Sequence, residues 1–151
     1  MFKLNYSQNY DEQMDVECIP LCDALNSLPG IQTCESCCGH GKKPFAIWFR
    51  CTSELGLRFL GRCIDRRYWR YGNNWRIELD NSDLNYDHSV FTMISHGYWG
   101  TDLKTTVGED AYEQANDFIR NMEWHLNCKK YIDAFIKDLS GFCIIDVDDK
   151  N

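Results

Sequence analysis

The residues best suited to chemistry lie in the stretch from residue 34 to residue 44, where Gly39 and Gly41 flank His40. Glycines permit positive φ and let backbone N–H groups converge on one point, which suits an anion. Lys42 and Lys43 add positive charge beside them. The stretch predicts a phosphate or carboxylate site, with a plain hairpin turn as the alternative. The assigned residues are Ser36, Cys37, Cys38, Gly39, His40, Gly41 and Lys42.

Two other kinds of chemistry compete for the same stretch. Thiolates and an imidazole can ligate zinc, and the metal set would be Cys34, Cys37, Cys38 and His40. Its spacing lacks the second Cys pair of a zinc ribbon, so further ligands would have to come from Cys51, His96 or Cys128. The other hypothesis is that Cys37 or Cys38 is a nucleophile, because glycine-rich turns and nearby cations lower a thiol pKa.

A second candidate segment, residues 66–76, interleaves four arginines with four aromatic residues. Guanidinium groups and ring faces together stack a base and hold a phosphate. The binding residues predicted here are Trp69, Arg70, Trp75 and Arg76. The alternative is that the aromatic rings pack beneath a sheet while the arginines are solvated.

A third candidate lies where a predicted strand ends at Ser95 and His96. If that strand lies beside the one leading to His40, the two histidines face one cleft and can transfer protons. We therefore add Ser95 and His96 to the predicted site. Trp48, between Ile47 and Phe49, is predicted to be a core residue rather than a ligand platform.

Hydrophobic periodicity predicts the elements that must position these residues. Three-to-four-residue spacing predicts helices over 15–28, 53–67 and 109–139, the last as one helix or a broken pair. Pro20 fits the first turn of the first helix, and Thr52 or Ser53 caps the second. Strands are predicted over 31–35, 45–51, 74–80 and 88–96, with a further short strand within 142–147.

The order α-β-β-α-β-β-α implies a two-layer α+β fold with a mainly antiparallel sheet and helices packed on it. We expect one compact domain over residues 1–151. Residues 1–14 would be a loosely held arm or edge strand, and residues 146–151 an acidic tail.

Composition narrows the function classes. With 44% hydrophobic and 26% charged residues among 151, the chain is neither disordered nor collagen-like. The net charge of -7 argues against an extended nucleic-acid partner, and no apolar run is long enough for a membrane helix. A cytoplasmic domain is expected, and self-association as a homodimer is compatible with it.

The nine cysteines are odd in number, so they cannot all pair within one chain. Reduced thiols are the expectation in a reducing compartment. Thiols at apolar positions of the predicted elements should be buried and inert, and these are Cys18, Cys22, Cys63, Cys128 and Cys143.

The run Thr33-Cys34-Glu35-Ser36-Cys37-Cys38-Gly39-His40, which follows the first helix, resembles the start of the wybutosine-synthesis methyltransferase family. That family has a helix and a strand leading into a Ser-Cys-Ser-Gly-Arg type turn. Ser36, Cys37 and Gly39 match the turn, whereas Cys38 replaces its second Ser and His40 its Arg. The resemblance covers about twenty residues and implies an α/β-type enzyme that uses S-adenosylmethionine to modify tRNA. The Cys-Cys-Gly-His-Gly turn is also similar to turns in uncharacterised bacterial and phage proteins.

Three functions follow as hypotheses. The first is a binding domain for a nucleotide-like anion, comparable to small phage proteins that sequester or sense signalling nucleotides. The second is the S-adenosylmethionine-dependent enzyme implied by the resemblance. The third is a zinc-stabilised interaction domain. No complete set of acid, base and nucleophile is visible, so the binding domain, which requires the fewest groups, is the leading hypothesis.

Overall fold

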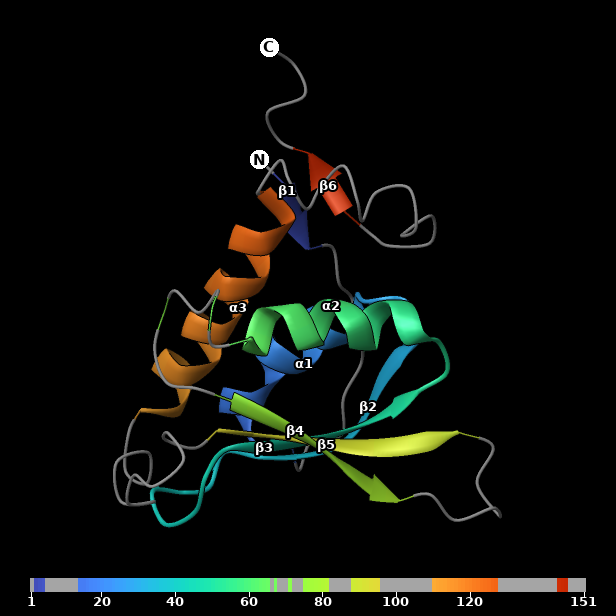
Figure 1. The fold of residues 1–151 in the computed structure, drawn as a ribbon. Coiled ribbons are helices and arrows are strands. Elements are labelled where there is room, and N and C mark those ends of the chain that lie inside the picture. The colour runs from blue at the N-terminus through green and yellow to red at the C-terminus, as the bar shows by residue number, and fades with distance from the viewer. Residues whose placement is uncertain are drawn as a thin grey trace.

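The computed structural model describes residues 2–4, 14–65, 67, 71, 75–81, 88–95, 110–127 and 144–146. Figure 1 shows the arrangement of the elements. In chain order these are β1 (Phe2–Leu4), the 3-10 helix η1 (Val16–Cys18), α1 (Ile19–Asn26), β2 (Ile31–Cys37), β3 (Ala46–Cys51), α2 (Glu54–Ile64), β4 (Trp75–Asn81), β5 (Ser89–Ser95), α3 (Ala111–Asn127) and β6 (Ile144–Asp146).

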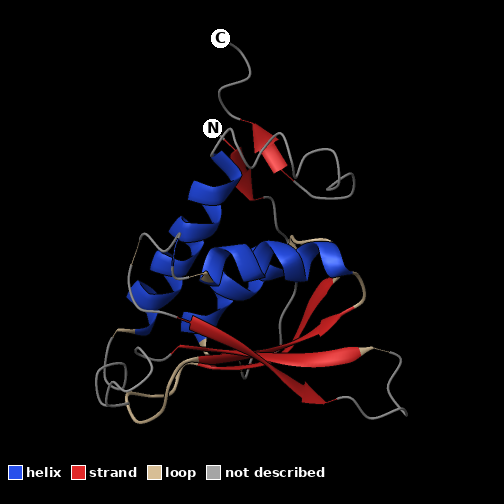
Figure 2. Cartoon of the chain, in the orientation of Figure 1, coloured by secondary structure: helices blue, strands red, loops and turns tan. Residues whose placement is uncertain are grey.

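The predicted fold class is confirmed. Four strands form an antiparallel sheet in the order β2-β3-β5-β4, so two hairpins lie side by side through β3 and β5. The helices α1, α2 and α3 pack on one face of this sheet, which Figure 2 shows as a helical layer above a strand layer. From α1 to α3 the order of the elements is α-β-β-α-β-β-α, as the hydrophobic periodicity predicted.

Local sequence signals explain where two of the helices begin. Pro20 lies in the first turn of α1, where its missing N–H removes no helical hydrogen bond. The hydroxyl oxygen of Ser53 accepts a hydrogen bond from the Leu55 N–H at 3.4 Å, which confirms Ser53 as the cap of α2. The predicted helix over 53–67 was too long, because α2 ends at Ile64 and Asp65 has an extended backbone.

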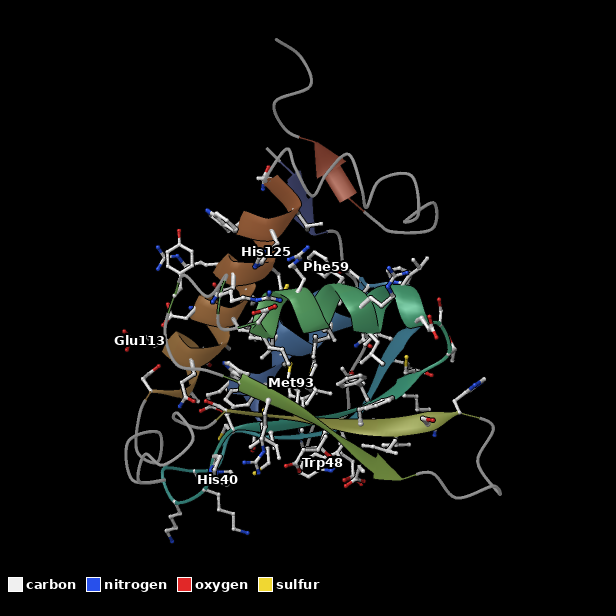
Figure 3. The ribbon with its side chains drawn as sticks, viewed as in Figure 1. His40, Trp48, Phe59, Met93, Glu113 and His125 are labelled. Atoms are coloured by element: carbon white, nitrogen blue, oxygen red, sulfur yellow. The ribbon has the colours of Figure 1, made fainter. Side chains whose placement is uncertain are left out.

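The core lies between the sheet and the helices, and alternation along β3 decides which side chains enter it. Ile47 and Phe49 face the helices and are fully buried. Trp48 points to the other face and is half-buried, so its prediction as a core residue was wrong. Figure 3 shows Trp48 on the side of the sheet away from the helices, whereas Phe59 and Met93 lie on the helical side. The reason is the two-residue period of a strand, which separates Trp48 from both apolar neighbours.

Strand boundaries also differ from the prediction at β2. This strand continues to Cys37 instead of ending at Glu35, and its register with β3 shifts between Thr33 and Glu35. Cys34 is the extra residue of this bulge. Ser36 and Cys37, which were predicted to lie in the turn, therefore lie in the strand.

Outside the main sheet, β1 pairs antiparallel with β6, so segments near the two ends of the chain lie together. The strand expected within residues 142–147 is confirmed, and β1 lies within the segment that was predicted to be an arm or edge strand. Among the described helices, none is long and apolar enough to span a bilayer.

The buried aromatic cluster of the core gives the first prediction. The Trp75 ring meets Phe45 and Phe118 edge-on, with centroids 5.5 and 5.3 Å away, and is only 4% exposed. Trp75→Ala should lower the free energy of unfolding by about 3–5 kcal/mol in urea titrations. Trp48→Ala, which removes the same ring from the open face, is the matched control and should cost less than half as much. Equal losses would contradict this account of the core.

Candidate functional site

The turn between β2 and β3 has an unusual backbone. Gly39, His40 and Gly41 have consecutive positive φ values of 85°, 50° and 73°. The carbonyl oxygen of Gly39 accepts the N–H groups of Lys42 and Lys43 at 2.9 and 3.0 Å. A Cβ on Gly39 would lie 1.9 Å from the Lys43 oxygen, so only glycine fits there. The left-handed backbone of His40 costs on the order of 1–3 kcal/mol, which points to a functional reason for its position.

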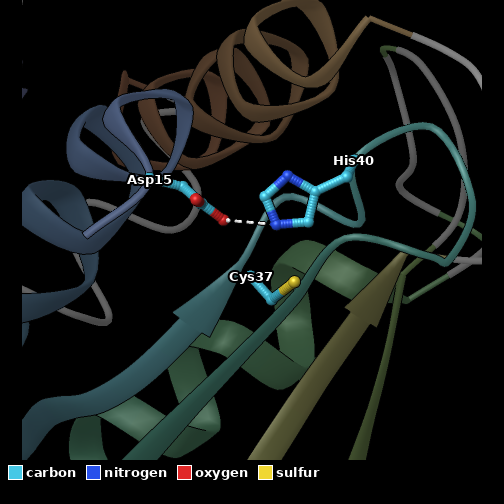
Figure 4. Close-up of side chains that lie close together, drawn as sticks. All are labelled: Asp15, Cys37 and His40. Atoms are coloured by element: carbon cyan, nitrogen blue, oxygen red, sulfur yellow. Dashed lines mark ion pairs between the residues drawn. The ribbon is translucent and has the colours of Figure 1, made fainter. Parts of the chain in front are cut away.

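The turn places the His40 imidazole next to the carboxylate of Asp15, which comes from another part of the chain. Nε2 of His40 lies 3.5 Å from Oδ2 of Asp15, the residue that precedes η1. The same oxygen accepts the Cys38 backbone N–H at 3.1 Å. Figure 4 shows Asp15, Cys37 and His40 close together. The carboxylate, the thiol and the imidazole each place one ligand atom within 4.8 Å of the others.

The second ring nitrogen of His40 is also engaged. Its Nδ1 lies 3.7 Å from Sγ of Cys38, while Nε2 faces Asp15. A thiol, an imidazole and a carboxylate in this order resemble a nucleophile, base and orienting group. However, burial, and to a lesser degree the Asp15 charge, raise the pKa of the Cys38 thiol. A thiol that stays protonated is a poor nucleophile, so the raised pKa does not favour covalent catalysis at Cys38.

The predicted metal set is only partly brought together. Cys37 and His40 belong to the cluster, but Cys34 is exposed at the strand bulge and its thiol donates to the Gln32 carbonyl oxygen at 3.7 Å. Asp15, which the sequence analysis did not select, supplies the remaining ligand atom. No spacing rule could have identified it, because the sheet edge brings together residues more than twenty positions apart.

Ser36 faces the helices rather than the turn. It lies on the helical side of β2, and its hydroxyl lowers the pKa of the Cys18 and Cys22 thiols against the larger effect of their burial. Lys42 and Lys43 are exposed in the turn that follows. Of the residues predicted in this stretch, His40, Gly41 and Lys42 are thus open to a ligand, whereas Ser36 is occupied by core contacts.

The aromatic and basic segment is arranged differently from the prediction. Trp75 is buried between Phe45 and Phe118, so its ring faces are covered and do not support a stacking role. Arg76 is accessible on the opposite face of β4 and pairs with Glu78 at 2.8 Å. Trp69 and Arg70 lie outside the described residues.

The cleft that we expected between His40 and His96 required the two strands leading to them to be neighbours, and they are not. β3 lies between β2 and β5, so the strands that lead to His40 and His96 are not side by side. Both strands run antiparallel to β3 and hence end at the same end of the sheet. Ser95 is fully buried there and its hydroxyl donates to Oε1 of Gln114 at 2.6 Å. His96 lies outside the described residues.

Comparison with known proteins adds no assignment. No protein family matches the chain, and neither a curated protein nor a solved structure is significantly similar to it. The resemblance to the wybutosine-synthesis methyltransferases consequently stays a prediction.

The cysteines fall into distinct environments, as predicted for three of them. Burial raises the pKa of Cys18 to about 12 and that of Cys22 to about 11, against hydrogen bonds from Ser36 that lower both. Burial also raises the pKa of Cys63 well above its usual value. These three thiols stay protonated, and Cys128 and Cys143 lie outside the described residues.

Alkylation kinetics should separate these environments. In the native protein at neutral pH, iodoacetamide should modify Cys34 first, because this thiol is exposed. It should reach Cys18, Cys22 and Cys63 only after unfolding, since the thiolate is the reacting form and burial suppresses it. Peptide mass spectrometry over time gives the order, and Cys34→Ser is the control that removes the fast site. Modification of Cys18 or Cys63 in native protein at the rate of Cys34 would contradict this.

Proposed function

We propose that this domain binds one divalent transition-metal ion of the zinc class through Asp15, Cys37 and His40, and that the bound ion receives a small anionic ligand. The observation that supports this is the approach of three ligand atoms to within 4.8 Å of one another. Carboxylate oxygen, thiolate sulfur and imidazole nitrogen are the donors that Zn²⁺ accepts in proteins. At bond lengths of about 2.0–2.3 Å, ligand atoms around a tetrahedral ion lie roughly 3.3–3.8 Å apart, so small side-chain rotations would suffice.

Contacts around the cluster favour a metal over a free anion at this point. An anion needs N–H donors, yet the Cys38 N–H already donates to the Asp15 carboxylate and the Gly39 N–H to the Cys37 thiol. The carboxylate adds negative charge, which repels an anion and attracts a cation. Cys38 beside Nδ1 of His40 resembles the outer partner that orients a ligating histidine.

Three protein ligands leave one position of a tetrahedral ion for another molecule. The His40 side chain is 65% exposed, so this position would be open to solvent. Lys42 and Lys43 are exposed in the same turn, two and three residues after His40, and their positive charge favours a negatively charged occupant. A domain that presents an ion in this way binds an anionic ligand such as a nucleotide, which joins the first and third hypotheses from the sequence.

The ion would also have a structural effect. It would link Asp15, ahead of η1, to the turn that follows β2. The Asp15 carboxylate already contacts this turn through the Cys38 N–H and the His40 imidazole. Because the unfolded chain does not hold this geometry, metal binding adds to the free energy of unfolding.

Titration with Co²⁺, a spectroscopic substitute for Zn²⁺, tests the site. We expect one ion per chain, with thiolate-to-cobalt absorption in the near ultraviolet, and competition by Zn²⁺. Asp15→Asn, Cys37→Ser and His40→Ala should each weaken binding by more than about 100-fold, because loss of a direct ligand exceeds the 10–100-fold effect of an outer partner. Affinity should fall as the pH is lowered, since protons compete for the thiolate and the imidazole.

Cys34→Ser is the matched control, because it removes a nearby exposed thiol that does not belong to the cluster. It should leave the affinity and the absorption unchanged. Zn²⁺ at 100 times its Kd should stabilise the wild-type protein by about 2.7 kcal/mol. Absence of binding, or loss of binding in Cys34→Ser with retention in Cys37→Ser, would refute the proposal.

A second candidate is an anion site that needs no metal. The exposed Lys42 and Lys43 favour it, because two neighbouring positive charges attract an anion. In the presence of a chelator, inorganic phosphate should then still bind, and Lys42→Ala should weaken it several-fold without changing the melting temperature. Phosphate binding that disappears with the chelator would instead support the metal.

A further inference from the structure

The face of the sheet opposite the helices carries a second set of residues suited to a ligand. Its side chains alternate with those of the core, and no described element packs against them (Figure 1). Across the middle of this face, strand pairing places Glu35 opposite Trp48, Trp48 opposite Thr92, and Thr92 opposite Glu78. An aromatic ring thus lies near the centre of an otherwise polar row.

Thr92 is the unusual member of this row. It is only 4% exposed although it faces away from the helices, and its hydroxyl oxygen is buried without a hydrogen-bond partner among the described residues. Its direct neighbour on β3 is the half-buried Trp48. A ligand on this face therefore reaches the half-buried Trp48 rather than the Thr92 hydroxyl.

Trp48 lies close to the candidate metal site on the same face of the sheet. Cys37 pairs with Ala46 at the end of β2, so it lies on the same face as Trp48. Trp48 is its diagonal neighbour, and such pairs are about 7–8 Å apart. One small molecule can therefore reach from the ion to the indole ring.

The surrounding charges favour a particular kind of molecule. Arg50 is exposed two residues beyond Trp48 on the same face of β3, and Lys42 is exposed near the cluster. Lys42 can contact a phosphate at the ion, whereas Arg50 lies on the far side of Trp48 from Cys37. Glu35, opposite Trp48, is an exposed hydrogen-bond acceptor suited to the amino group of a base.

We propose that Trp48 stacks on the planar base of a mononucleotide whose phosphate lies at the Asp15–Cys37–His40 ion. This inference rests on the proposed metal site and names the class of its anionic ligand. Stacking on an indole ring accepts any planar base, whereas the Glu35 carboxylate favours bases that carry an amino group.

Calorimetric titration of the protein loaded with one equivalent of Zn²⁺ tests this, with adenosine monophosphate, adenosine and inorganic phosphate as probes. The mononucleotide should bind at least tenfold more tightly than phosphate. Trp48→Leu should lower mononucleotide affinity at least fivefold while phosphate affinity stays unchanged. Trp48→Phe, which keeps an aromatic ring, should retain most of the affinity. Tyr112→Leu, an exposed aromatic residue on α3, is the control and should have no effect.

Co²⁺ titration of the same variants separates the two proposals. Trp48→Leu should bind Co²⁺ like the wild type, which shows that the metal site is intact when the stacking residue is lost. Normal Co²⁺ binding with a mononucleotide no tighter than phosphate, or unaffected by Trp48→Leu, overturns the nucleotide inference alone. If Co²⁺ does not bind, the metal proposal fails. Titration of the mononucleotide in the presence of a chelator then tests whether a base stacks on Trp48. Binding that depends on Trp48 then supports the stacking role, and its absence overturns it.

Discussion

One-sided burial of the four-stranded sheet is the constraint on which the rest of this structure depends. All three described α-helices pack on one face, so each strand divides its side chains between a dry core and an open surface. β3 shows the division most clearly, since Phe49 is fully buried while Trp48 and Arg50 face the other side. The period of two leaves no choice in this assignment, and it is the reason that apolar and chemically useful residues can share a strand.

The β2–β3 turn is the second point where local geometry and function meet. Gly39 and Gly41 adopt positive φ without steric cost. His40 between them also has a positive φ, and for a residue with a side chain this conformation is strained. The gain is an imidazole with Asp15 on one side and Cys38 on the other. A strained residue that delivers a titratable side chain to two partners is typical of binding sites rather than of simple hairpins.

Environment, not number, determines what the cysteines do. Cys18, Cys22 and Cys63 are small apolar residues of the core, and burial keeps their thiols protonated. Cys37 differs because it is the last residue of an edge strand, next to a carboxylate and an imidazole. The sequence shows nine thiols of equal appearance, and only packing distinguishes the inert ones from the candidate ligand.

The sequence by itself determined the elements, their order and the antiparallel two-layer fold, because hydrophobic period, caps and turn residues act over a few positions. It also located the turn around His40 as the place of interest. Tertiary structure decided that Asp15 joins it, that β3 separates β2 from β5, and that Trp75 is buried while the half-buried Trp48 faces away from the helices. These outcomes depend on strand order and on which face the helices cover, and both are set by contacts between residues distant in the chain.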